Sequence, residues 1–171
     1  MINKLNSIFV TFFGIGKIKK IPGTFASLVT TVLLFFLFHI LNVSPNIILF
    51  AVIIIFLISF YAVNIFIKDL SSKDPKEVVI DEVIGQSIPL YLYEISHNIP
   101  KDSNDALKFY LIIFILFRFF DIAKPFPVNY FDKNFKNSFG VIMDDVCAGL
   151  YVVAVLVLYM VISSWKNFLK S

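Results

Sequence analysis

Residues 46–67 read NIILFAVIIIFLISFYAVNIFI, a run that contains no charged side chain. A helix needs about 20 apolar residues to cross the roughly 30 Å hydrocarbon core of a bilayer. The run therefore predicts a transmembrane helix, and it decides the fold class. The composition agrees, because 58% of the 171 residues are hydrophobic and only 16% are charged. Soluble domains are about 45–50% apolar and about 25% charged.

Working outward from this run, three more stretches are long and apolar enough to span: Phe25–Val43, Ala106–Ile122 and Val146–Ile162. The short connection Val43–Asn46 predicts that the first two spans form an antiparallel hairpin. A fifth stretch, Val83–Ile95, is shorter and more polar, so it is either a kinked, protein-buried helix or a re-entrant segment. We expect an all-α integral membrane protein, a bundle of four long transmembrane helices plus this short helix, folded as one domain over residues 1–171.

The remaining composition excludes several classes of protein. The net charge of +3 and the lack of a basic, aromatic-rich soluble segment argue against a nucleic-acid partner. The single cysteine, Cys147, excludes an internal disulfide framework. Ile8–Ile15 is followed by lysines rather than by a cleavage pattern, which favours an interfacial N-terminal segment over a signal peptide. His39 and His97 are expected in packing or surface roles.

Acidic residues occur in three clusters: Asp81 with Glu82, Asp121 alone, and Asp144 with Asp145. If the N-terminus is cytoplasmic and Val83–Ile95 crosses, all five carboxylates reach the cytoplasmic face. Most lysines and arginines then also lie there, as the positive-inside rule expects. A re-entrant Val83–Ile95 would separate Asp121 from Asp81, so we prefer the crossing. Clustered carboxylates need a cation, and Mg²⁺ bound by carboxylates and a substrate phosphate fits. The alternative for each acid alone is a helix-dipole or capping role.

Cationic residues accompany the acids. Arg118, Asp121 and Lys124 recur at three-residue steps, which predicts a common side of one helix, and Pro125 and Pro127 end that helix. Arginine and lysine suit phosphate, although snorkelling to lipid headgroups is the alternative.

The stretch GIGKIKKIPGTFASL, residues 14–28, suggests a turn and a helix start capped by Thr24 or Ser27. Such a start can bind phosphate, or it can be purely structural.

Four strings together resemble the phosphatidylglycerophosphatase A family: IPGTFASL (21–28), VIDEVIGQ (79–86), FRFFDIAKPFPVNYFDKN (117–134) and FGVIMDDVCAGL (139–150). Gly85 and Gly149 match structural positions of that family, whereas Ala26-Ser27 departs from its usual Gly-Ser. The resemblance implies a Mg²⁺-dependent phosphatase of the cytoplasmic (inner) membrane. It would convert phosphatidylglycerophosphate, a phospholipid substrate drawn from the bilayer, to phosphatidylglycerol in phospholipid biosynthesis. The residues that the resemblance carries over as catalytic, metal-binding or substrate-binding are Asp81, Glu82, Arg118, Asp121, Lys124, Asp144 and Asp145, and we add Thr24 and Ser27 as substrate-binding candidates.

Two other functions are compatible with clustered acids in a small membrane protein. A transporter or channel could use them as a cation pathway, but such residues belong near mid-membrane and these lie at helix ends. A metal-dependent phosphatidyltransferase would carry a D-G-x-x-A-R spacing, which this sequence lacks. The sequence assigns no oligomeric state.

Overall fold

A computed structural model describes residues 2–68, 75–96, 103–135 and 137–168 of the chain. Within these ranges all regular structure is helical, which confirms the predicted fold class. The helices, in chain order, are α1 (Ile2–Val10), α2 (Pro22–Phe35), α3 (Pro45–Ile67), α4 (Ile80–Ile95), α5 (Ser103–Ala123), α6 (Val128–Asn134) and α7 (Ser138–Phe168). A 3-10 turn covers Ile15–Lys17, and a π-helical turn, Phe36–Ile40, extends α2.

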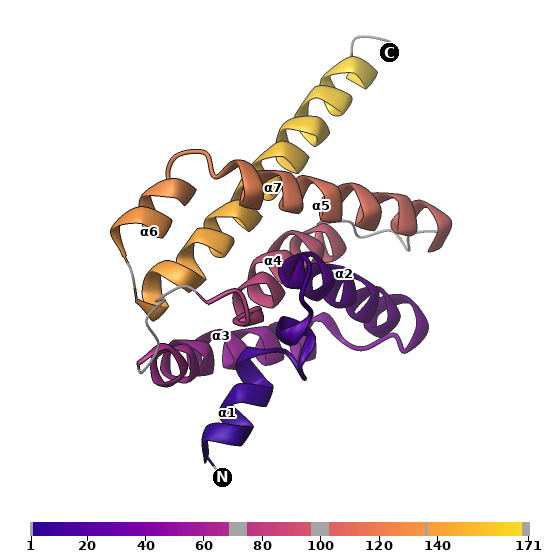
Figure 1. The fold of residues 1–171 in the computed structure, drawn as a ribbon. Coiled ribbons are helices and arrows are strands. Elements are labelled where there is room, and N and C mark those ends of the chain that lie inside the picture. The colour runs from indigo at the N-terminus through magenta and orange to yellow at the C-terminus, as the bar shows by residue number, and fades with distance from the viewer. Residues whose placement is uncertain (1, 69–74, 97–102, 136, 169–171) are drawn as a thin grey trace.

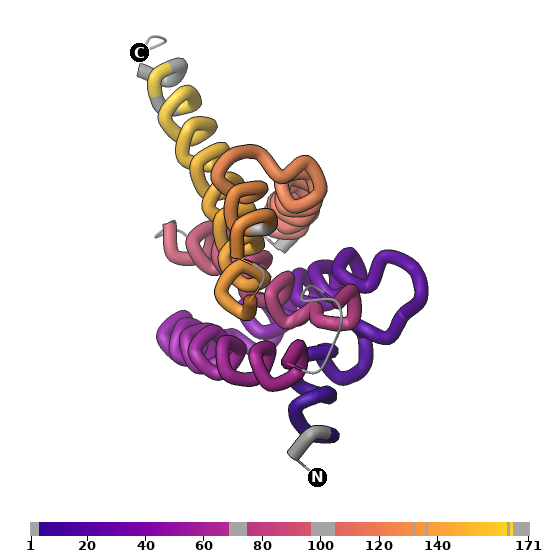
Figure 2. The backbone as a smooth tube through the Cα atoms, turned by 60° about the vertical axis from the view of Figure 1, so that its left-hand side comes forward, coloured from indigo at the N-terminus to yellow at the C-terminus, as the bar shows by residue number. Residues whose placement is uncertain are grey.

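The short helix α4 lies at the centre of the molecule. It packs against α2, α3, α5 and α7 (Figures 1 and 2). The hydrophobic core runs along α4 as two clusters, one around Ile84 at its first half and one around Leu90 at its second half. The segment is a helix buried by protein, and its course in the membrane, crossing or re-entrant, stays a prediction. Its polar residues are tolerated because protein, and not lipid, surrounds them.

Two glycines bring α4 and α7 into close contact. A Cβ atom added to Gly149 would lie 2.4 Å from the carbonyl oxygen of Gly85, and one added to Gly85 would lie 2.6 Å from the carbonyl oxygen of Asp145. Pro89, one turn after Gly85, has no N–H, so it cannot donate the usual helical hydrogen bond to the Gly85 carbonyl. Gly149, which has no side chain, lies against this carbonyl oxygen. Small residues at helix crossings allow such backbone approach in membrane proteins.

Three helical stretches are long and apolar enough to cross a membrane: Pro22–Ile40, Pro45–Ile67 and Ser138–Ser163. They correspond to three of the four predicted spans. The fourth, Ala106–Ile122, lies within α5, which has the necessary length but carries charges near both ends, at Asp105, Lys108, Arg118 and Asp121. A fourth span and a membrane crossing by α4 therefore stay predictions.

Several predicted boundaries were wrong in ways that affect the site. The last helix begins at Ser138 and not at Val146, because the stretch before the apolar run is also helical. Helix α4 begins at Ile80, so Asp81 and Glu82 lie in its first turn and not before it. The two helices of the expected hairpin, α2 and α3, each pack against α4, and their antiparallel arrangement stays a prediction.

Helix α7 is the longest element. Its last turns project beyond the other helices, and α1 and the end of α7 lie at opposite ends of the molecule (Figure 1). The C-terminal half of α7 exposes large apolar side chains, among them Tyr159 at 57% and Trp165 at 65% exposure. Such a surface is compatible with lipid and not with water.

A buried polar pair lies at the opposite end of α4 from Asp81. His39 Nε2 is 3.1 Å from Glu94 Oε1, and both side chains are only 11% exposed. Phe35 and Tyr110 surround the imidazole ring, with ring centroids 4.7 and 5.8 Å from it. The predicted packing role of His39 is thus confirmed, while His97 lies outside the described residues.

Candidate active site

A cavity of about 490 Å³ opens where the first turns of α2 and α4 meet the end of α5 and the second turn of α7. We call it the acidic cavity. Its lining includes all seven charged residues that the sequence singles out and, in addition, two lysines from connecting segments. The lining residues that carry charge are Lys19, Lys76, Asp81, Glu82, Arg118, Asp121, Lys124, Asp144 and Asp145. Residues far apart in the chain therefore line one cavity, in agreement with the prediction that the five carboxylates converge.

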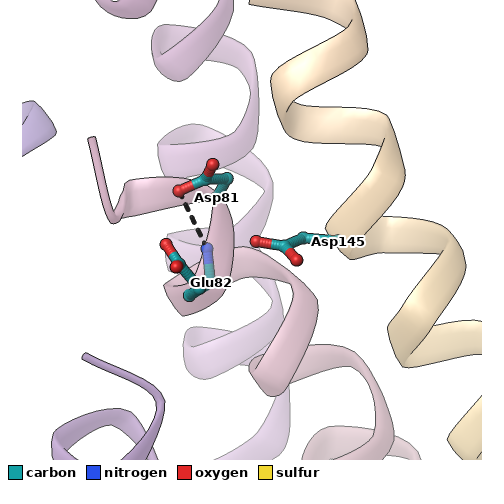
Figure 3. Close-up of side chains that lie close together, drawn as sticks. All are labelled: Asp81, Glu82 and Asp145. Carbon is teal, nitrogen blue, oxygen red and sulfur yellow. Dashed lines mark hydrogen bonds between the residues drawn. The ribbon is translucent and has the colours of Figure 1, made fainter. Parts of the chain in front are cut away.

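Three carboxylates form a compact group in this cavity. Asp81, Glu82 and Asp145 each offer an oxygen, and these oxygens lie within 4.8 Å of one another. Figure 3 shows Asp145 projecting from α7 toward the two acids in the first turn of α4. The backbone N–H of Glu82 donates to Asp81 Oδ1 at 3.1 Å, which fixes the orientation of that carboxylate. A divalent cation fits this group, because hard cations prefer carboxylate oxygens.

One oxygen of the three carboxylates supports the fit. Glu82 Oε2 is buried and has no hydrogen-bond partner among the described residues. Burial raises the pKa of the Glu82 carboxyl, because desolvation disfavours its charged form, and the nearby Asp121 charge adds to this. Buried acceptors without donors are costly, and a cation would satisfy them. A metal ion bound by these carboxylate oxygens would therefore satisfy them.

Asp121 and Arg118 form an ion pair on the last turns of α5. Arg118 Nη1 lies 2.7 Å from Asp121 Oδ2, with the two side chains 15% and 14% exposed. The same nitrogen donates a longer bond of 3.4 Å to Ser27 Oγ on α2. The arginine is thus held by protein partners at the cavity wall and does not snorkel to lipid. The i, i+3 spacing that predicted a shared face is confirmed for this pair.

Lys124 reaches the cavity by a different route from the predicted one. Helix α5 ends at Ala123, and Lys124 follows it with a positive φ of 43°, so it is not part of the helical face. Its Nζ lies 3.0 Å from Asp144 Oδ2 on α7. Asp144 and Asp145, adjacent in sequence, therefore face different partners, as side chains about 100° apart on a helix should.

Thr24 and Ser27 do not cap α2, which corrects the predicted helix start. The residue before the helix is Ile21, and Pro22 and Gly23 open the first turn. Gly23 lies against Glu82, since a Cβ there would be 1.9 Å from Glu82 Oε1. Thr24 lines the acidic cavity, whereas Ser27 is buried behind it, donating to the Gly23 carbonyl at 2.9 Å. Ser27 thus contacts Arg118 and does not line the cavity.

Sequence reasoning missed two residues of the site. Lys19 and Lys76 line the cavity, but in the sequence they look like ordinary basic residues of cytoplasmic loops. Their positions just before the PGT and DE strings were the available signal. Gln86, one turn after Glu82 on α4, is fully buried and does not line the cavity. An amide within a buried helix is a signal of a polar interior, because such groups are costly without partners.

Comparison with known proteins identifies the family. The family model described as phosphatidylglycerophosphatase A matches residues 8–160. A Haemophilus influenzae protein of that name is 39% identical over 84% of this chain and 81% of its own length. A Bacteroides thetaiotaomicron protein, provisionally named a phosphatidylinositol-3-phosphatase, is 35% identical over 82% and 84% of the two chains. The Escherichia coli phosphatidylglycerophosphatase A is 28% identical over 90% and 81%.

No solved structure matches the chain. The family match covers the acidic cavity and most of the bundle, and it agrees with the resemblance drawn from the four sequence strings. The chain therefore belongs to the phosphatidylglycerophosphatase A family of membrane lipid phosphatases.

Proposed function

We propose that the protein hydrolyses phosphatidylglycerophosphate to phosphatidylglycerol and inorganic phosphate, with Mg²⁺ as its cofactor. The observation that carries the proposal is the three-carboxylate group of Asp81, Glu82 and Asp145 inside a cavity that is also lined by cations. The names of the family and of two relatives supply the substrate.

Charge balance in the acidic cavity favours this assignment. Five carboxylates and four cationic side chains leave one formal negative charge, which would repel a phosphate. The three carboxylates are the residues we assign to Mg²⁺. A bound Mg²⁺ would reverse the net charge, polarise the phosphoryl oxygens and lower the pKa of an attacking water. Asp121 and Asp144 are further candidate ligands, and in the ion-free protein they hold the two cations in place.

Arg118 and Lys124 are the groups we assign to the phosphate. Asp121 orients Arg118, and Asp144 orients Lys124. Both cations are therefore already positioned in the cavity before the substrate binds. Arginine can donate two parallel bonds to phosphate oxygens, and lysine adds a point charge. Thr24, at the cavity wall, offers a hydroxyl donor. In the reaction a water oxygen bonds to phosphorus, the bond to the glycerol oxygen breaks, and a water proton ends on that oxygen. Positioning and charge stabilisation carry most of the rate in such transfers.

We also propose that the acidic cavity faces the cytoplasm from the inner membrane. Lys19 and Lys76 line the cavity itself, and basic residues favour the cytoplasmic side. This orientation presents the cavity to headgroups of the inner leaflet.

The test is phosphate release from phosphatidylglycerophosphate by the purified protein in detergent, with Mg²⁺ and with chelator. We expect activity only with the metal. Asp145→Asn should lower activity about 100-fold or more, because even the hydrogen-bond partners of metal ligands cost about 10–100-fold when they are mutated. The matched control is Asp105→Asn. Asp105 is exposed and paired with Lys108 at the start of α5, so this variant should keep its activity. Activity that is insensitive to chelator and survives Asp145→Asn would refute the proposal.

A further inference from the structure

An apolar groove lies between α2 and α5. Its volume is about 200 Å³, and its walls are carbon almost throughout. Four residues from each helix line it: Leu28, Thr31, Val32 and Phe35 from α2, and Leu107, Tyr110, Leu111 and Phe114 from α5. The two polar side chains among them do not present their oxygens to it. Thr31 donates its hydroxyl to the Ser27 carbonyl at 2.8 Å, and the Tyr110 hydroxyl is buried.

The groove continues the acidic cavity along the same two helices. On α2 the cavity lining ends at Thr24 and the groove begins at Leu28, while on α5 the groove ends at Phe114 and the cavity begins at Arg118. Each interval is one helical turn, about 6 Å along the axis. The far members, Phe35 and Leu107, lie about 16 Å from Thr24 and Arg118 by the same rise. A polar site thus passes into an apolar one within a single turn on both walls.

We infer that this groove binds one acyl chain of the phospholipid substrate while its phosphate occupies the acidic cavity. The inference rests on the proposed function. It adds a binding site for the acyl chain of the substrate, which the proposed function does not specify. In phosphatidylglycerophosphate a glycerol, a phosphodiester and a second glycerol join the terminal phosphate to the acyl chains, so the substrate changes from polar to apolar along its length. The adjoining cavity and groove have the same order of chemistry. An acyl chain that enters the groove from the cavity side meets Leu28 and Phe114 first.

The groove acts by orientation and packing. A lipid chain in the bilayer is already out of water, so the groove gains little from the hydrophobic effect and must bind through close contacts. Fixing one chain between two helices limits how the headgroup can rotate, and such positioning can account for large factors in rate. Phe35 and Tyr110 stiffen the far part of the groove, because their rings pack edge to face with centroids 5.3 Å apart.

A pair of leucines on α2 provides the activity test. Leu28 lines the groove and is 41% exposed, whereas Leu33 is 43% exposed and does not line it. Tryptophan fits at both positions without entering the core. We expect Leu28→Trp to lower kcat/KM for a long-chain substrate about 10-fold or more through misplacement. Leu33→Trp should match the unmodified protein. With a dihexanoyl substrate, whose chains end early, the two variants should differ less.

A second measurement uses the unmodified protein. Phosphatidylglycerophosphate with a photoreactive group in mid-chain is activated by light in phosphatidylcholine vesicles, and the labelled residues are mapped by mass spectrometry. Adducts should concentrate on the groove residues and decrease when unlabelled substrate is added. Photoreactive phosphatidylcholine should label the groove less.

Three outcomes would overturn the inference: equal activity of Leu28→Trp and Leu33→Trp, adducts spread evenly over the lipid-facing helices, or equal labelling by phosphatidylcholine. The last would mean that bulk lipid fills the groove. If the unmodified protein releases no phosphate from the substrate, the proposed function fails instead, and the labelling pattern still decides whether the groove binds the chain.

Discussion

Replacing Gly149 with alanine tests how the crossing of α4 and α7 supports the site. The new methyl carbon would lie 2.4 Å from the Gly85 carbonyl oxygen, while ordinary contact begins at 3.4 Å. The obstacle is backbone, so no rotamer change can relieve it, and the helices must separate by about 1 Å. Overpacking of this kind costs about 1–3 kcal/mol of folding free energy.

The same displacement would reach the carboxylates. Asp145 lies one turn before Gly149 on α7, and Asp81 and Glu82 lie about one turn before Gly85 on α4, so the three acids move with the helices that carry them. Mg²⁺ accepts oxygens only near 2.0–2.1 Å. A shift of about 1 Å should therefore lower kcat/KM about 100-fold and raise the Mg²⁺ concentration needed for half-maximal rate.

The assay is phosphate release from phosphatidylglycerophosphate across a Mg²⁺ titration, with thermal unfolding in detergent measured in parallel. Ala154→Val is the control, because it enlarges an exposed side chain on the same helix. We expect Gly149→Ala to unfold cooperatively at a lower temperature and to lose activity while still folded. Wild-type activity at the wild-type Mg²⁺ requirement would refute the reasoning that the glycine contact sets the carboxylate spacing.

Three further predictions concern Arg118, the candidate Mg²⁺ ligands and the buried His39 pair. Arg118→Lys should lower kcat/KM about 10-fold or more, because lysine cannot donate in parallel to phosphate and to Asp121; unchanged kinetics would contradict the assigned role. Mg²⁺ should raise the Tm of the unmodified protein but not that of Asp145→Asn, since only a bound ligand stabilises the folded state; equal shifts would mean that the ion binds elsewhere. Glu94→Ala should lower the free energy of unfolding by about 1–3 kcal/mol and leave kcat/KM near normal, because the His39 pair lies far from the cavity; an inactive but stable variant would argue otherwise.

Much of the site could be predicted because its chemistry is local in the sequence. Apolar runs predicted the helices, and acids beside Arg118 and Lys124 predicted a shared cavity, which the structure contains. The sequence did not predict which acids group together and which acids pair with cations. Asp81, Glu82 and Asp145 group together, whereas Asp121 and Asp144 pair with cations, and these choices depend on how helices cross.

The errors share a physical origin. Hydrophobicity located the apolar part of each helix but not its polar first turns, so α4 and α7 were predicted to start too late. The central position of α4 was also not apparent, because polar residues such as Gln86 look unsuitable for a membrane interior. They are tolerated because neighbouring helices, and not lipid, surround them. Lys19 and Lys76 were missed because they resemble ordinary loop lysines, and their positions just before the PGT and DE strings were not used.

The length of α7 relates the site to the thickness of the membrane. Asp145 and Trp165 are separated by about 30 Å along this single helix, which is close to the thickness of a hydrocarbon core. Exposed tryptophan prefers the boundary between lipid and water. If Trp165 lies at one boundary, the length of the helix would place Asp145 near the phosphates of the opposite leaflet. A substrate phosphate could then reach the carboxylates while its lipid stays in that leaflet.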